Sequence, residues 1–128
     1  MLKARGVDDR VSTVCGDFYQ SVVSGCDAYL LKNVLHDWDD QHCQLILDNC
    51  RRAMVVGTKI LIVEIMVEKN DRRNFGAFRD IHVMTVCRGG RERGHAEYQR
   101  LLQASGFKLQ RVFDSPIISL IEAVASEE

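Results

Sequence analysis

An abrupt change from apolar to charged residues at His36 is the strongest constraint on the fold of this 128-residue chain. The run Ala28–Leu35 (AYLLKNVL) is nearly all apolar, as expected of a strand that is covered on both faces. The acidic stretch that follows, His36–Asp40 (HDWDD), offers the cap and first-turn carboxylates that a helix amino terminus favours. Residues Cys43–Met54 then place apolar side chains at helical spacing. A buried strand followed at once by an amphipathic helix is typical of an α/β fold.

The rest of the sequence continues this alternation, with boundaries at glycine, proline or polar clusters. The predicted strands are Arg10–Cys15, Thr58–Val67, Phe107–Phe113 and Ile117–Val124, and the predicted helices are Asn74–Cys87 and His95–Ser105. Only three residues, Asp114–Pro116, separate the last two strands, so these strands must be antiparallel. We therefore predict a single α/β domain whose sheet is mostly parallel and ends in an antiparallel hairpin.

Composition excludes several classes of function. Lys and Arg total 17 against 18 Asp and Glu, so no basic surplus indicates binding to nucleic acid or to a membrane surface. No apolar run approaches the roughly 20 residues that span a bilayer, and the first ten residues lack the apolar segment of a secretory signal. The five cysteines are odd in number and include no C-x-x-C pair, which favours a reducing, cytoplasmic compartment.

Candidate functional residues follow from the sheet itself, because ligands of open α/β sheets bind beyond the carboxyl ends of the parallel strands. Asp17 and Phe18 follow the first predicted strand, His36 follows the second, and Glu64 lies toward the end of the third. A histidine beside carboxylates is suited to removing a proton, since its ordinary pKa is about 6.5. The four histidines lack the clustered spacing of a zinc site, so we predict no metal.

The string Leu30–Asp40 (LLKNVLHDWDD) closely resembles the LLK-x-x-LHDW-[SD]-D signature of the S-adenosylmethionine-dependent O-methyltransferases of the caffeic acid and hydroxyindole type. Further motifs follow in the order and spacing of that family. They are GDFY from Gly16, CRRAM ending at Met54, LIVE ending at Glu64, GGRER over Gly89–Arg93 and SLIEA over Ser119–Ala123. The resemblance covers nearly the whole chain and implies a Rossmann-like methyltransferase sheet.

The resemblance also implies an activity, methyl transfer from S-adenosylmethionine to a hydroxyl of a small molecule. His36 matches the general base that takes the proton of the acceptor hydroxyl, and Glu64 and Glu92 match the acids that flank and orient this base. The positions that match residues contacting the cofactor, or lying beside it, are Asp17, Phe18, Lys32, Asp37 and Trp38.

The chain departs from the family pattern in what precedes these motifs. It contains no G-x-G-x-G turn, and we expect residues 1–128 to be the C-terminal portion of a catalytic domain, without the N-terminal dimerisation domain and the Gly-rich cofactor loop. This portion is then expected to bind S-adenosylmethionine poorly alone and to act only when the missing half completes it. The alternative is a non-enzymatic, truncated module that dimerises or binds a partner.

Two further consequences concern the sheet and the acceptor pocket. The family's two missing strands lie between Arg10–Cys15 and Ala28–Leu35, so either these two strands pair directly or two copies join at that edge. We favour the homodimer, because exposed strand edges pair with other chains. Gly94 stands where the family usually has Thr, which removes a helix cap, and His82 stands where Asn is common in a substrate-facing helix.

Overall fold

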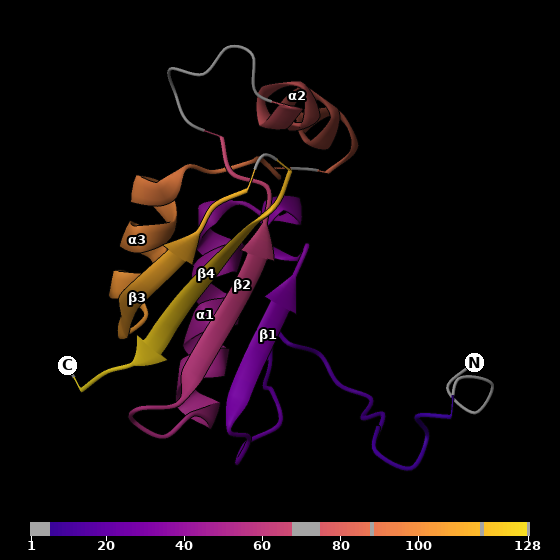
Figure 1. The fold of residues 1–128 in the computed structure, drawn as a ribbon, viewed down its shortest axis with the longest axis vertical. Helices are drawn as coiled ribbons and strands as arrows, with labels where there is room; N and C mark the ends of the chain where they lie inside the picture. Colours follow the sequence, from indigo (N-terminus) through magenta and orange to yellow (C-terminus); the bar gives the residue numbers. More distant parts are fainter. Residues whose placement is uncertain (1–5, 68–74, 88, 116, 128) are drawn as a thin grey trace.

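The computed structural model describes residues 6–67, 75–87, 89–115 and 117–127. A four-stranded sheet carries two helices on one face, and a third helix lies beyond one end of the strands (Figure 1). The elements are β1 (Ala28–Lys32), the 3-10 helix η2 (Leu35–Asp37), α1 (Asp40–Ala53), β2 (Lys59–Glu64), α2 (Phe75–Val86), α3 (His95–Ala104), β3 (Phe107–Phe113) and β4 (Ser119–Ala125). Helices α1 and α3 cover the sheet, whereas α2 lies beyond the carboxyl end of β2. None of the helices in these ranges is long and apolar enough to cross a membrane.

The order of strands in the sheet is β1-β2-β4-β3. Strands β1 and β2 are parallel, with Ala28 opposite Lys59, and β4 is antiparallel to both β2 and β3. The α/β class and the closing antiparallel hairpin are therefore confirmed. The carboxyl ends of β1 and β2 meet at one edge of the sheet, and this arrangement positions the candidate site.

The predicted strand Arg10–Cys15 is wrong. These residues form no strand, and Val11 and Val14 are 45% and 67% exposed. A β-branched segment becomes a strand only when a neighbouring strand completes its hydrogen bonds, and in the described part of the chain β1 pairs with β2 alone. The direct pairing of Arg10–Cys15 with the next strand is likewise not formed, and the amino-terminal segment extends away from the sheet (Figure 1).

The predicted strand Ala28–Leu35 is shorter and more exposed than expected. It ends at Lys32, because Asn33 takes a positive φ of 54° that breaks the extended chain before η2 begins. Tyr29 and Leu31 pack against the core, but Leu30 on the opposite face is 61% exposed. The expectation of cover on both faces is therefore wrong, since helices α1 and α3 cover only one face of this sheet.

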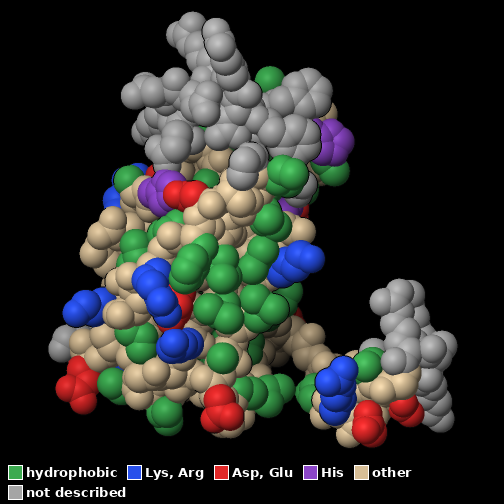
Figure 2. All heavy atoms as spheres, in the orientation of Figure 1, with side chains coloured by type: hydrophobic (Ala, Val, Ile, Leu, Met, Phe, Trp, Pro, Cys, Tyr) green, Lys and Arg blue, Asp and Glu red, His purple; other side chains and the backbone are tan. Residues whose placement is uncertain are grey.

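The uncovered face of the sheet carries a continuous apolar surface, seen as green side chains over the strands in Figure 2. Leu30 lies opposite Leu61 in the β1–β2 ladder, and Val63 lies opposite Leu120 in the β2–β4 ladder. Leu61, Val63 and Leu120 are only half-buried. We refer to these four side chains as the open apolar face.

Helix α1 confirms the prediction from its acidic start and apolar spacing. The side chain of Asp39 caps it by accepting a hydrogen bond from the amide of His42 at 2.9 Å. Cys43 and Cys50 are buried in the core, and burial raises the pKa of each thiol to about 11. These two cysteines are packing residues of the core.

Helix α3 shows how a glycine at the cap position is accommodated. Gly94 has no side chain to cap the helix, but the carboxylate of Glu97 accepts a hydrogen bond from the amide of Gly94 at 3.0 Å. This is one of the two bonds of a capping box, so it offsets part of the helix stability that is lost without a capping side chain at position 94. The helix buries Tyr98, Leu101 and Leu102, and Gly106 follows it with a φ of 75°. His82, on α2, is exposed.

Candidate active site

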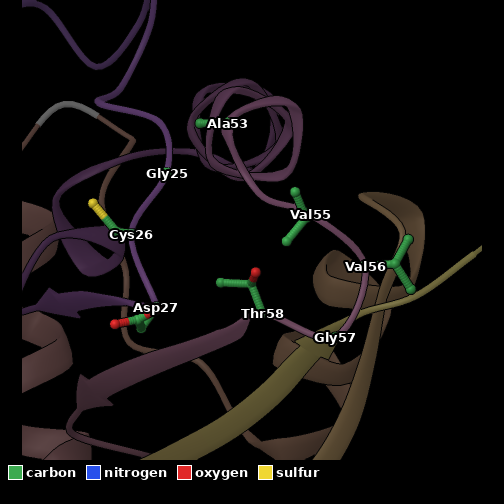
Figure 3. A pocket seen from close by; sticks show the side chains of 8 residues that line it. All are labelled: Gly25, Cys26, Asp27, Ala53, Val55, Val56, Gly57 and Thr58. Atoms are coloured by element: carbon green, nitrogen blue, oxygen red, sulfur yellow. The ribbon is translucent and has the colours of Figure 1, made fainter.

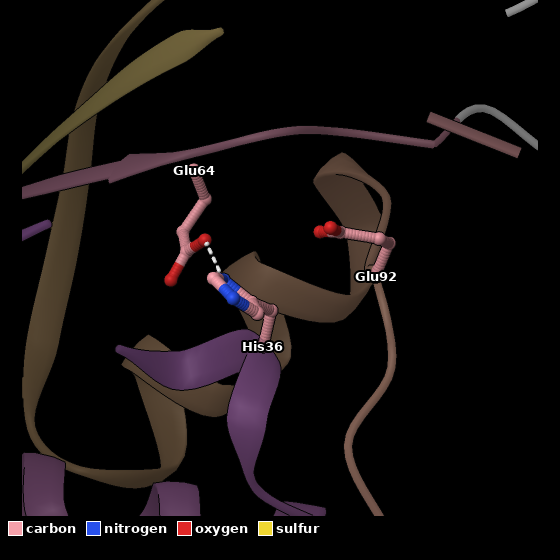
Figure 4. A group of neighbouring side chains, drawn as sticks. All are labelled: His36, Glu64 and Glu92. Carbon is pink, nitrogen blue, oxygen red and sulfur yellow. Dashed lines mark hydrogen bonds and ion pairs between the residues drawn. The ribbon is translucent and has the colours of Figure 1, made fainter. Parts of the chain in front are cut away.

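His36 and Glu64 come together where β1 and β2 end. Because the two strands are parallel and in register, the turn after β1 lies beside the last residue of β2. The imidazole Nδ1 of His36 is 2.7 Å from Oε2 of Glu64 (Figure 4). The other oxygen, Oε1, accepts the amides of Val34 at 3.0 Å and Leu35 at 2.9 Å. Glu64 is 0% exposed, so one buried carboxylate holds both the imidazole and the turn that carries it.

Glu92 reaches the same place from the loop before α3. Its carboxylate points toward the imidazole in Figure 4, and the ligand atoms of His36, Glu64 and Glu92 all lie within 4.8 Å of one another. The close approach of this loop depends on Gly90. A Cβ atom there would lie 2.6 Å from the carbonyl oxygen of His36 and 3.0 Å from that of Asp37, so only glycine fits without a shift of the backbone.

A third carboxylate contacts the other side of the imidazole. Oδ1 of Asp37 is 3.2 Å from Nε2 of His36, and the thiol of Cys87 donates a hydrogen bond to the same oxygen at 3.2 Å. The hydrogen bond to Glu64 raises the pKa of His36 above 6.5; burial opposes this shift, and the charges of Glu64, Glu92 and Asp37 add to it. In this geometry the imidazole is a strong proton acceptor.

The raised pKa of His36 predicts that the folded chain loses stability as the pH rises. At pH values below 6.5 the imidazole is protonated in both the folded and unfolded states, and its interactions with the carboxylates contribute fully to the free energy of unfolding. This contribution is lost as the pH rises through the higher pKa of the folded state. Urea unfolding at several pH values checks this, with His36→Gln as the control whose profile lacks this component. A difference between the two proteins that is independent of pH would contradict it.

The predicted cofactor residues are brought together only in part. The rings of Phe18 and Trp38 lie 6.4 Å apart, with Tyr19 between them at 4.9 and 5.1 Å. Trp38 directly follows the turn that bears His36 and Asp37, so the aromatic cluster lies next to this turn. Asp17 is exposed and accepts the amide of Tyr19 at 2.9 Å, which shapes the turn that presents Phe18. Lys32 is exposed at the end of β1.

Sequence reasoning missed three residues of this region. Tyr19 and His42 join the aromatic cluster, with His42 centred 5.6 Å from the Tyr19 ring and 5.9 Å from the Trp38 ring. The GDFY motif contains Tyr19, and His42 lies one helical turn after Trp38, so the helix period was the available signal. Arg93 is fully buried beside Glu92, and its place in the GGRER motif gave no sign of burial.

The donor set His36, Glu64 and Glu92 is also close enough to hold a metal ion. Both oxygens of Glu64 already accept hydrogen bonds, however, from two backbone amides and from the imidazole. A cation would have to displace the His36 contact, so the geometry favours proton transfer. That this chain takes no metal remains a prediction.

A separate cavity of about 390 Å³ lies at the amino-terminal ends of β1 and β2 (Figure 3). Its lining comes from the segments that precede β1 and β2, including Asp27 and Thr58. His36 and Glu64 lie at the other ends of these strands, so the cavity does not contribute to the site.

Comparison with known proteins identifies the family. Residues 2–108 match the model of the O-methyltransferase domain. The chain is 45% identical over 123 residues to the phenazine O-methyltransferase PhzM of Lysobacter antibioticus, a match that covers 95% of this chain and 36% of that protein. It is 38% identical to the 3-amino-4-hydroxybenzoate 4-O-methyltransferase of Streptomyces cremeus, covering 85% of this chain and 30% of that protein.

Solved structures that resemble this chain also include O-methyltransferases. The crystal structure of LaPhzM superposes with a TM-score of 0.89 at 44% identity, over 97% of this chain and 37% of that one. An O-methyltransferase from neocarzinostatin biosynthesis, in complex with S-adenosylmethionine and 2-hydroxy-5-methyl naphthoic acid, superposes with a TM-score of 0.85 at 29% identity, over 97% and 36%. The chain thus spans somewhat more than a third of the length of these structures, and it belongs to the O-methyltransferase domain family.

Proposed function

We propose that this chain supplies the proton-accepting part of an O-methyltransferase site that transfers a methyl group from S-adenosylmethionine to the hydroxyl of a small molecule. The observation that carries the proposal is the buried His36, held by Glu64 at 2.7 Å with Glu92 beside it. Relatives that share this part of the fold are small-molecule O-methyltransferases, and one of the solved structures holds S-adenosylmethionine together with a hydroxylated naphthoic acid.

His36 would act as the general base. With its Nδ1–H donated to Glu64, neutral His36 presents an unprotonated Nε2 that can accept the proton of the acceptor hydroxyl. S-adenosylmethionine supplies an electrophilic methyl group on a sulfonium. As the acceptor oxygen forms its bond to that methyl carbon, the carbon–sulfur bond breaks and its electron pair stays on sulfur, while the proton remains on His36 until solvent removes it. Glu64 and Glu92 stabilise the imidazolium that forms.

Asp37 has to move for this reaction. Its carboxylate now lies 3.2 Å from Nε2, in the place that the acceptor hydroxyl would take. Asp37 is partly exposed, with 43% of its side chain accessible, so it can turn outward once its contacts with His36 and with the thiol of Cys87 break. Proton transfer to Nε2 therefore requires the carboxylate of Asp37 to leave this position.

The cofactor side of the site fits in part. The neighbouring rings of Phe18 and Trp38 are suited to packing against an adenine, and Asp17 lies on the same turn as Phe18. We include Lys32 and Asp37 in this group because they flank the turn at the carboxyl edge of β1. No Gly-rich turn is present to hold the rest of the cofactor, so these five residues would provide only one side of its pocket.

The proposal can be tested by joining this chain to the rest of a related O-methyltransferase. A chimera in which this chain replaces the matching part of the Lysobacter phenazine O-methyltransferase should transfer labelled methyl groups to the acceptor of that enzyme. This chain alone should not, and calorimetry should find only weak binding of S-adenosylmethionine to it, because the Gly-rich turn is missing. A folded chimera that binds S-adenosylmethionine without any transfer would argue against the function. Micromolar binding by the chain alone would show that the cofactor can be held without a Gly-rich turn.

The non-enzymatic alternative rests on the open apolar face and the unpaired edge of β1. In the described part of the chain β1 pairs on one side only, and Leu30 is 61% exposed beside that edge. We propose that the rest of an O-methyltransferase domain covers these surfaces in a complete enzyme, and that a second copy covers them when residues 1–128 are alone. Sedimentation at micromolar concentration is then expected to show a dimer. A monodisperse, folded monomer would contradict the pairing of two copies.

A further inference from the structure

Arg93 is a fully buried cation next to the candidate site. It is 0% exposed, and its guanidinium donates to groups within residues 35–40 and to the carbonyl of Arg91. Nη1 donates to the carbonyl of Leu35 at 2.8 Å and Nη2 to the carbonyl of Trp38 at 2.7 Å. Nε and Nη2 both donate to Oδ1 of Asp40, at 2.9 and 2.8 Å. This set of bonds satisfies a buried charge that would otherwise cost several kcal/mol.

The two carbonyls that Arg93 binds bracket η2, the turn that carries His36. Leu35 begins this turn and Trp38 directly follows it. The Leu35 peptide is thereby fixed from both sides, because its amide donates to Glu64 while its carbonyl accepts from Arg93. One guanidinium therefore sets the position of the backbone on either side of the imidazole.

The backbone of Arg93 is fixed as well. Its carbonyl accepts the amide of Val67 at 3.2 Å, and Arg93 forms an isolated parallel bridge with Met66. Met66 follows Glu64 by two residues, and Glu92 directly precedes Arg93. The segments that carry all three members of the cluster thus meet at this one residue.

We propose that Arg93 is a positioning residue for the base: it holds the His36 turn against Glu64 and Glu92 at the distance that the proton transfer requires. The proposal rests on the function proposed above, in which His36 is the base. The fork shape of the guanidinium is essential, because it reaches two carbonyls and a carboxylate at once, whereas the ammonium of lysine is a compact point charge.

Arg91 provides a matched control on the same loop. It also pairs with Asp40, at 3.1 Å, and with Glu97, but its side chain is 37% exposed. None of its described side-chain bonds reaches the η2 turn. Arg91→Lys therefore weakens the pairing at Asp40 while keeping the charge, and it does not release the carbonyls of Leu35 and Trp38 from Arg93.

The test follows the imidazole of His36 by NMR in the chain as it exists, with the signal assigned by its loss in His36→Gln. Arg93→Lys is expected to move the titration midpoint of His36 down toward 6.5, because the contact with Glu64 loosens while the local charge is kept. Arg91→Lys is expected to leave the midpoint unchanged. A folded Arg93→Lys chain with the midpoint of the unaltered chain would overturn the proposal.

A second variant covers the case in which Arg93→Lys does not fold. Asp40→Asn keeps Arg93 but weakens the anchor of its Nε and Nη2, so a smaller downward shift is expected, and an unchanged midpoint would overturn the proposal equally. In the active chimera, Arg93→Lys is expected to lower kcat by about 10²-fold with little effect on the KM for S-adenosylmethionine. The NMR shifts need no methyl transfer, so an inactive chimera with the expected shifts would refute the proposed function and leave the positioning role standing.

Discussion

Replacing His36 by glutamine in the completed enzyme is expected to slow methyl transfer by about 10²–10⁴-fold, the usual contribution of a positioned general base. A phenolic acceptor with a pKa near 10 is rarely ionised at neutral pH, so the reaction depends on a group that removes its proton. Glutamine has nearly the size of histidine but cannot accept a proton near neutral pH. The measurement is the rate of labelled methyl transfer at saturating S-adenosylmethionine.

Two controls separate the loss of a base from a loss of structure. The affinity of His36→Gln for S-adenosylmethionine should remain nearly unchanged, because the aromatic rings of Phe18 and Trp38 are intact. His95→Gln removes another imidazole, one that is paired with Asp114 at the surface at 3.0 Å, and should leave the rate unchanged. If His36→Gln retained most of the rate, His36 would not be the base.

Replacing Glu64 by alanine is expected to destabilise the fold by about 3–5 kcal/mol, the usual cost of removing one partner from a buried charged pair. Glu64 is 0% exposed and accepts two backbone amides and the imidazole of His36. Its loss leaves the buried amide of Leu35 and the half-buried amide of Val34 without their acceptor, and buried unpaired donors are costly. Urea unfolding of the chain measures the difference.

Glu122→Ala is the matched control for this change. Glu122, on β4 of the same sheet, is also buried, but the side chains of its partners Lys59 and Arg111 are 55% and 61% exposed. Exposed ion pairs contribute little to stability, so a much smaller loss is expected. Equal losses for the two variants would mean that the Glu64 network does not hold the site together.

Much of the candidate site could be predicted from the sequence because strand periodicity and topology determine where its residues lie. Once β1 and β2 are recognised as parallel neighbours, the residues that end them must meet at one edge, which brings His36 to Glu64. The strand Phe107–Phe113 and its antiparallel pairing were predicted for a similar reason, since a three-residue connection leaves one geometry. Local pattern and chain connectivity suffice in both cases.

The other features of the fold and of the site depend on contacts with distant residues, which the local sequence does not reveal. Arg10–Cys15 has the composition of a strand, but β propensity is realised only where a neighbouring strand completes the ladder. The end of β1 at Lys32 depends on the positive φ of Asn33, a conformation that Asn tolerates but does not require. The burial of Arg93 was hidden because its carbonyl partners on Leu35 and Trp38 are separated from it by more than fifty residues.

The pH dependence of kcat/KM in the completed enzyme tests most directly whether His36 is the base. A base must be unprotonated in the free enzyme, so kcat/KM should rise with pH through a midpoint above 6.5, the ordinary pKa of the imidazole. The same midpoint should appear when the His36 signal is titrated by NMR in that protein. Agreement of the two midpoints is the predicted result. A kcat/KM that stays constant while His36 visibly loses its proton would contradict the assignment of His36 as the base.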